Sequence, residues 1–546
     1  MKNLKKSDVV FYAIILAYAV YAAIYIYKTS FVMHGERFFV LFDDAMISMR
    51  YAKNLAYGSG LVWNPGGARV EGYTNPLWIV FMSLFHLFPI PASKISLFIQ
   101  ASGALFLIAS LFFIKKIAEL LSGSLPIVAI LAVILTAFYM PLNNWVLQGM
   151  EVSVLTLIIS AAVWMALNSW HSKRQPSPWL YVLLGIGTLV RIDMAVPYLV
   201  IMAFLVITSR EHRRQNLIWG LGLFAVFIIS QTLFRVLYYG DPLPNTYYLK
   251  MTGYSMVVRI ARGLYVFLQF VQQFNWVLFL LPLSILVFRR DRDVLLLFLV
   301  FAGQVTYSIY VGGDAWEQKG GANRYFAIVM PLYFILFVYA VDLIRKAFVN
   351  LIQPHYRGAP PRAWVTFVSE RKLLSNVVLI VFVVMGMVNF NFIGDFKSLQ
   401  RWALRREPLF IEGNKEDVQI ALDLKQITSP QATIAVVAAG AIPYFSDRYS
   451  IDLLGKSDVK IAHEKSKVNV GLGNLGDLRP GHNKWDYDYS IGQLQPDVVT
   501  QLWGRTEEAK PYINKYYTGG GAGDNLFFSL YTGSPNILWD KVKPMP

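Results

Sequence analysis

Long apolar stretches recur along the first 393 residues of this chain. Hydrophobic residues make up 55% of its 546 residues and charged residues only 15%, with a mean hydropathy of +0.44. This composition lies outside the range of soluble globular proteins. We predict a polytopic α-helical membrane protein with about eleven transmembrane helices of about 20 residues each. The expected spans lie near residues 9–27, 75–90, 94–114, 125–141, 150–167, 177–190, 194–208, 216–237, 264–287, 294–310 and 324–344, with a further candidate at 373–393.

Lysine and arginine residues gather in short loops between these stretches. The net charge is +16, and clusters such as Arg210, Arg213 and Arg214 stand in such loops. Positive charge in short loops marks the cytoplasmic side of a membrane, because it resists translocation. The charge therefore indicates topology, and no nucleic acid partner is expected. We predict a multi-pass protein of the bacterial cytoplasmic (inner) membrane, with the loop 28–74 on the periplasmic side.

One part of the chain does not fit a simple alternation of sides. Residue 74 is expected outside and the loop at residue 168 inside, so an odd number of crossings has to join them. Four apolar segments lie between these points. We expect either 75–90 or 125–141, which are both short, to be re-entrant or to stop before crossing.

The character of the sequence changes after residue 393. The remaining residues are mixed in polarity, with strand-like runs at 433–440, 448–455 and 496–503 separated by Gly- and Pro-rich turns. We predict a transmembrane catalytic domain over residues 1–393 and a soluble extracytoplasmic (periplasmic) α/β domain over residues 394–546. The second domain is expected to bind the acceptor.

Two adjacent carboxylates, Asp43 and Asp44, follow the apolar run FFVLF in the loop 28–74. Charge beside a bilayer is costly, so two neighbouring acids indicate a function. We predict that Asp43 acts as a general base toward a sugar hydroxyl and that Asp44 orients the acceptor or stabilises charge. The pair is also the candidate site for a divalent cation. The alternative is that one Asp only caps the following helix.

The residues after Asp44 are typical of a short amphipathic helix. We expect this helix to lie on the membrane surface, with Met46 and Met49 toward lipid and Arg50 toward water. Gly58 is a suitable residue to end it.

Further polar residues stand in segments that the topology places on the same side of the membrane. Arg191 and Asp193 form either a structural ion pair or, through the arginine, a phosphate contact. Aromatic residues such as Tyr73 are also common at membrane surfaces without any further role. The candidates for the donor phosphate are Arg191, Lys250, Lys319 and Arg324, and those for the acceptor side of the site are Glu71, Tyr73, Asn75, Asp193 and Asp314.

Several common site chemistries lack their residues here. The chain has no cysteine, which excludes disulfides and cysteine nucleophiles, and no Walker A or HExxH pattern occurs. An enzyme on the outer face therefore needs an activated donor that reaches it through the bilayer, and a polyprenyl-phosphate sugar fits. The competing hypothesis is a transporter or flippase for lipid-linked sugars, which also places charges within a helix bundle.

Six segments resemble a known class of enzyme: FDDAMISMRYAKNLAYGSGLVWNPG, VEGYTNPLW, LVRID, YYGDPLPNTYYLK, YVGGD and AAGAIPYFSDRYSIDLLGKSD. The class is the GT-C superfamily of glycosyltransferases that use polyprenyl-phosphate sugars. The sequence is most similar to its arabinofuranosyltransferases of the terminal β-(1→2) type and their bacterial relatives. The resemblance implies a catalytic carboxylate at Asp43 or Asp44. It also implies transfer of a sugar such as arabinofuranose to a cell-envelope glycan or protein.

Overall fold

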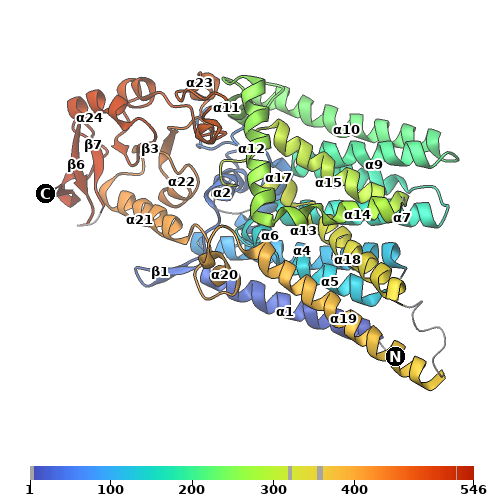
Figure 1. Cartoon of the computed structure of the whole chain (residues 1–546). Coiled ribbons are helices and arrows are strands. Elements are labelled where there is room, and N and C mark those ends of the chain that lie inside the picture. Colours follow the sequence, from blue (N-terminus) through green and yellow to red (C-terminus); the bar gives the residue numbers. More distant parts are fainter. Residues whose placement is uncertain are drawn as a thin grey trace.

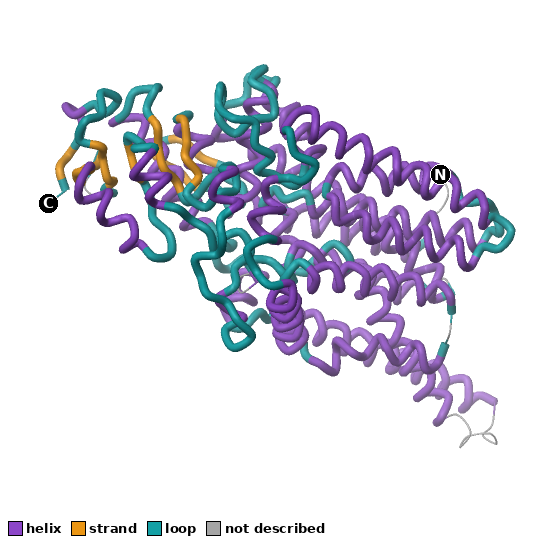
Figure 2. The backbone as a smooth tube through the Cα atoms, turned by 90° about the horizontal axis from the view of Figure 1, so that it is seen from above, coloured by secondary structure: helices purple, strands orange, loops and turns teal. Residues whose placement is uncertain are grey.

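The computed structural model describes residues 5–545 apart from 124, 290, 318–321, 353–360 and 524–525. It has two parts, a bundle of long helices and a smaller part with a β-sheet that lies at one end of the bundle (Figure 1). A view from above shows the strands gathered at that end, with the purple helices running away from it (Figure 2). The predicted helical bundle followed by a C-terminal α/β domain is confirmed.

Within the described residues, five helices are long and apolar enough to cross a membrane. Three further pairs satisfy the same test together but are bent by 54°, 83° and 109° at their breaks, which gives up to eight. The five are α1 (Lys6–Lys28), α4 (Ala92–Ser122), α7 (Val152–His171), α10 (Arg213–Tyr239) and α15 (Arg292–Tyr310). The pairs are α5 (Pro126–Ala137) with α6 (Met140–Val146), α11 (Asn245–Met251) with α12 (Met256–Phe274), and the part Ser375–Asn391 of α19 (Pro361–Asn391) with α20 (Phe396–Trp402). The other helices of the bundle include α3 (Pro76–His86), α8 (Pro178–Val190), α9 (Ala195–Thr208), α17 (Arg324–Ala327) and α18 (Met330–Ile352).

Helix α3 forms within the expected span 75–90 but is short. It has only 11 residues, so it spans roughly 16 Å at 1.5 Å per residue, about half of the hydrocarbon core. The other candidate, 125–141, falls in the pair α5–α6, which is bent by 54° and is either a broken span or a re-entrant loop. Both segments thus depart from a straight span, and which of them does not cross stays a prediction.

The continuous span expected at 264–287 is wrong. Asn275 breaks it with φ at +75° and caps the next short helix, α13 (Trp276–Leu280), by accepting two backbone N–H bonds. Helix α12, before this break, runs across the direction of the long helices (Figure 1). After α13 a second short helix follows, α14 (Ser284–Phe288). The apolar composition of this segment correctly indicated helices, but composition does not reveal a residue with left-handed backbone, such as Asn275, in its middle.

Helix α2 (Asp43–Ala56) forms where a helix was expected, but it does not lie on the membrane surface. Met46 and Met49 are fully buried, and Arg50 is only 2% exposed. The Arg50 guanidinium donates to the carbonyl oxygens of Trp63 and Pro443 at 3.0 and 2.6 Å. The expected lipid and water faces are wrong because the C-terminal domain covers this helix.

The C-terminal domain is built on a six-stranded sheet of order β4-β3-β5-β7-β6-β8. Strand β3 pairs in parallel with β4 and β5, and the other pairs are antiparallel. All three predicted strand segments contain a strand. The strands are β3 (Thr433–Val436), β4 (Tyr449–Asp452), β5 (Val498–Val499), β6 (Tyr517–Gly521), β7 (Phe528–Tyr531) and β8 (Lys543–Pro544), and the helices are α21 (Ile411–Ile427), α22 (Ala441–Ser446), α23 (Val459–His463) and α24 (Lys510–Tyr516). A separate hairpin, β1 (Phe31–Met33) with β2 (Glu36–Phe38), lies in the loop after α1.

Candidate active site

A cavity of about 1100 Å³ lies where the helix bundle meets the C-terminal domain. Both parts contribute to its wall, and charged side chains from the two parts meet there. Of the residues predicted for the site, Asp43, Asp44, Lys250, Asp314 and Arg324 line this cavity.

Asp44 is held between two cations from different parts of the molecule. Its Oδ2 lies 2.8 Å from Nη1 of Arg324, and its Oδ1 lies 2.8 Å from Nζ of Lys456 in the C-terminal domain. Arg324 in turn pairs with Asp314, with 2.9 Å between Nε and Oδ2. Burial alone would raise the pKa of Asp44, but the charges of Lys456, Arg324 and Lys250 hold it well below its ordinary value. Asp44 is therefore ionised at any physiological pH.

A tight turn after β4 presents Lys456 to Asp44. The buried carboxylate of Asp452, the last residue of β4, accepts backbone N–H bonds from three residues that follow, at 2.7 to 3.2 Å. Gly455 has φ at +79°, which residues with a Cβ rarely adopt. The segment DLLGKS thus folds on itself, and this local geometry directs the lysine toward the bundle.

Asp43 receives its contacts from the start of helix α22. Its Oδ1 accepts the backbone N–H bonds of Gly440 and Ala441 at 3.1 and 3.0 Å. Burial and then the neighbouring charge of Asp44 raise the pKa of Asp43 to about 6 despite these bonds. In the described part of the chain no hydrogen bond reaches its Oδ2. A carboxylate that ionises near neutral pH and keeps one open oxygen is suited to accept a proton.

The alternative that one Asp caps the following helix, α2, is wrong. Helix α2 has no side-chain cap, so neither Asp43 nor Asp44 caps it. Asp43 instead satisfies the first N–H groups of α22, a helix of the other domain. Its capping role is therefore an interdomain contact.

Lys250 lies on α11 and lines the cavity beside Asp44 and Arg324. Its ammonium group has no hydrogen bond or ion pair among the described residues. Phosphate groups are commonly bound by such a lysine. Among the predicted phosphate contacts that the structure describes, Lys250 is the one that keeps its donors open, because Arg324 already pairs with Asp44 and Asp314.

Arg191 and Asp193 form a closed ion pair behind the cavity wall. Two parallel hydrogen bonds join the guanidinium to the carboxylate at 2.6 and 2.8 Å. Arg191 also donates to Glu151 at 2.9 Å and to the Arg324 carbonyl at 3.2 Å. Neither Arg191 nor Asp193 lines the cavity, so the geometry corresponds to the structural ion pair and supports the backbone at Arg324 from behind.

The Arg191→Met variant is expected to lose about 3–5 kcal/mol of stability, because it leaves the buried carboxylates of Glu151 and Asp193 without their cation. The measurement is thermal unfolding of the detergent-solubilised protein. The triple variant with Glu151→Gln and Asp193→Asn as well should regain part of the loss, since no buried charge then stays unpaired. Equal melting temperatures for wild type and Arg191→Met would contradict this role.

Those of the remaining predicted residues that the structure describes do not line the cavity. Glu71 is buried in an ion pair with Arg235 of α10, at 2.8 Å. Tyr73 and Asn75 line a small recess beside Asp44, and Asn75 also donates to Glu151 at 3.0 Å. Lys319 lies outside the described residues.

The C-terminal domain contributes site residues that were not predicted from the sequence. Lys456 directly follows the predicted strand segment 448–455 and lies in one of the six segments that resemble GT-C enzymes. Its place in the sequence could therefore have marked it as a site residue. Asp417 of α21 also lines the cavity, but it stands in an ordinary amphipathic helix that offers no such signal.

The two carboxylates do not fit a divalent cation site. Both oxygens of Asp44 face protein cations, and Oδ1 of Asp43 accepts two N–H bonds. Among the described residues, no group of three or more acidic, histidine or cysteine side chains is arranged to hold a metal ion.

Two family models match parts of the chain. The model described as dolichyl-phosphate-mannose-protein mannosyltransferase matches residues 85–234, from the end of α3 into α10. A domain of unknown function (DUF8728) matches residues 407–522, which include Asp417 and Lys456. No curated protein sequence matches the chain.

The whole chain is similar in fold to ArnT from Cupriavidus metallidurans. The crystal structure of ArnT bound to undecaprenyl phosphate superposes with a TM-score of 0.58 and 13% identity, covering 97% of this chain and 98% of ArnT. The apo structure of ArnT has a TM-score of 0.57 and 13% identity, covering 95% of this chain and 97% of ArnT. The archaeal oligosaccharyltransferase AglB from Archaeoglobus fulgidus has a TM-score of 0.47 and 11% identity, covering 96% of this chain and 74% of AglB. The likeness to ArnT confirms the predicted GT-C fold.

Proposed function

We propose that this chain, a GT-C glycosyltransferase by its fold and family match, transfers a sugar from a polyprenyl-phosphate donor to a hydroxyl acceptor. One observation carries the proposal. A lysine without a partner among the described residues, Lys250, and a carboxylate with one open oxygen, Asp43, line the same cavity. The lysine suits a phosphate, and the carboxylate suits a hydroxyl that must lose its proton.

The reaction follows from these two groups. Oδ2 of Asp43 accepts the proton of the acceptor hydroxyl while the acceptor oxygen bonds to the anomeric carbon. The bond between that carbon and the phosphate oxygen breaks, and its electron pair leaves with the polyprenyl phosphate. Lys250, with Arg324 next to it, stabilises the charge on the departing phosphate. Asp44 holds Arg324 and Lys456 in place for this step.

We further propose the periplasmic side of the cytoplasmic membrane as the place of the reaction, on the distribution of Lys and Arg in the short loops. The acceptor is then a cell-envelope glycan or protein. The C-terminal domain takes part in binding it, because this domain forms one wall of the cavity. Arabinofuranose is the first donor sugar to test, on the resemblance of the six sequence segments.

Binding of undecaprenyl phosphate tests the phosphate site, since this lipid is bound in the ArnT crystal structure. Lys250→Ala is expected to weaken binding at least about tenfold, because a hydrogen bond to a charged group contributes roughly 1.5–3 kcal/mol. Lys460→Ala, on α23 outside this cavity, is the matched control and should bind like wild type. Equal binding by Lys250→Ala and wild type, or no binding by wild type, would refute the proposed site.

Transfer in detergent separates an enzyme from a flippase. A flippase moves its lipid between two leaflets, so it has no measurable activity without a sealed membrane. A glycosyltransferase forms a new glycosidic bond in micelles as well. Incubation of solubilised protein with radiolabelled polyprenyl-phosphate sugars and hydroxyl acceptors should therefore give labelled product. Its absence with every donor, together with lipid movement in proteoliposomes, would favour the transporter.

A further inference from the structure

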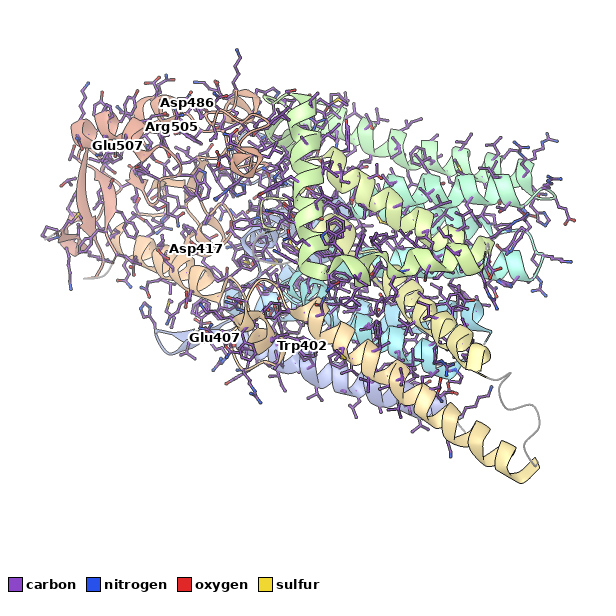
Figure 3. The ribbon with its side chains drawn as sticks, in the orientation of Figure 1. Trp402, Glu407, Asp417, Asp486, Arg505 and Glu507 are labelled. Atoms are coloured by element: carbon purple, nitrogen blue, oxygen red, sulfur yellow. The ribbon has the colours of Figure 1, made fainter. Side chains whose placement is uncertain are left out.

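Asp417 is a buried acid in the domain wall of the cavity. It lies on α21, is 8% exposed, and lines the cavity together with Asp43. In Figure 3 it lies in the lower part of the C-terminal domain, whereas Asp486, Arg505 and Glu507 lie along the upper edge. Helix α21 is fastened close to Asp43, because Asn414 donates to the Leu41 carbonyl at 3.1 Å.

No cation compensates the Asp417 carboxylate within the described chain. Its one hydrogen bond there comes from Nε2 of Gln501, at 3.3 Å to Oδ1. Burial and the nearby Asp43 raise the pKa of Asp417 well above its ordinary value. A buried carboxyl group beside another acid, without an arginine or lysine, destabilises a fold. Its Oδ2 has no hydrogen bond within the described chain, so this carboxyl group keeps capacity to bind a ligand in the cavity.

The surroundings of Asp417 show what kind of ligand fits. Gln501 is itself oriented, because its Oε1 accepts the Ala438 N–H at 2.9 Å. Trp503, two residues further on, also lines the cavity, and its indole N–H is already bonded to the His482 carbonyl at 2.9 Å. This wall thus combines carboxyl oxygens, which accept from hydroxyl groups, with an aromatic side chain that offers apolar surface.

We propose that Asp417, Gln501 and Trp503 form a subsite for a sugar ring of the acceptor, so that the acceptor is a carbohydrate. This inference rests on the proposed glycosyltransferase function. A sugar has several hydroxyl groups. One of them reacts and gives its proton to Asp43, and another binds to Asp417. Its C–H face packs on Trp503. A serine or threonine of a peptide offers a single hydroxyl, so only backbone N–H groups of the peptide are left for Asp417.

Titration of wild type and variants with methyl glycosides and with short Ser/Thr peptides, followed by tryptophan fluorescence, tests this subsite. We expect wild type to bind at least one glycoside, and Asp417→Asn to bind it tenfold or more weakly. Trp503→Leu should also weaken binding, and Trp503→Phe should restore part of it. Asp423→Asn, on the same helix but outside the cavity, is the matched control and should bind like wild type.

Stability gives an independent readout. Asp417→Asn keeps the shape and removes an uncompensated buried acid, so its melting temperature should equal or exceed that of wild type. A lower melting temperature would indicate a structural residue and overturn the proposal. So would equal glycoside binding by Asp417→Asn and wild type, or wild-type binding of peptides alone. Undecaprenyl phosphate binding is measured on the same samples. If wild type does not bind undecaprenyl phosphate, the proposed glycosyltransferase function fails, and not only the sugar subsite. Asp417→Asn should bind this lipid like wild type.

Discussion

Asp43→Asn is expected to lower the rate of sugar transfer by about 10²- to 10⁴-fold, the usual contribution of a general base. The amide keeps the size of the side chain, and its oxygen can still accept the N–H bonds of Gly440 and Ala441. It cannot take a proton from the acceptor. Binding of undecaprenyl phosphate should therefore stay close to wild type while turnover is lost. The measurement is the initial rate of transfer in detergent at saturating donor.

The pH dependence of the rate gives a second test of the same residue. Because the pKa of Asp43 is raised to about 6, the wild-type rate should fall as the pH drops through 6 and level off above it. The residual rate of Asp43→Asn should lack this step. Asp477→Asn, an exposed change in the C-terminal domain, should keep both the rate and the profile. Full activity of Asp43→Asn with an unchanged profile would exclude Asp43 as the base.

The same pKa shift determines the sign of the effect on stability. A pKa raised on folding means that Asp43 is most favourable to the folded state when it is protonated, below its unfolded pKa near 4. That contribution is lost as the pH rises through about 6. At pH 7.5 Asp43→Asn should therefore be at least as stable as wild type. A lower melting temperature would mean that the loss of activity comes from unfolding.

Gly440→Ala is the second change with a large expected effect. A Cβ at this position would overlap the Asp43 carbonyl oxygen and lie 2.6 Å from its Oδ1. Helix α22 would have to move away from α2, and both N–H bonds to Asp43 would lengthen. A displacement of about 1 Å at reacting groups costs about 100-fold in rate, and overpacking costs about 1–3 kcal/mol of stability. We expect both losses together.

Transfer rate and thermal unfolding are the measurements for Gly440→Ala. Gly476→Ala is the matched control, because a Cβ there meets no atom within 4 Å. The control should keep wild-type activity and melting temperature. If Gly440→Ala behaves like the control, the close approach of α22 to Asp43 does not matter for the reaction. The position of the C-terminal domain on α2 would then have no part in catalysis.

The sequence was informative wherever the signal is local. Apolar length predicted the bundle, and strand-like runs between Gly- and Pro-rich turns predicted the strands at β3, β4 and β5. Two adjacent charges beside an apolar run predicted a site at Asp43 and Asp44, and both residues line the cavity. The faces of helix α2 could not be predicted in the same way. Periodicity separates apolar from polar positions, but it does not say whether lipid or another domain covers them.

By itself, the sequence determined a helical membrane bundle, a C-terminal α/β domain and a pair of acids at the start of α2, because these follow from neighbouring residues. Only the tertiary structure decided how the two acids differ. Asp44 meets Arg324 and Lys456, which keep it ionised, whereas Asp43 meets two backbone amides and an open cavity. Lys456 and the amides come from about 400 residues further along the chain. No local pattern encodes such contacts, since they arise only when the domain packs on the bundle.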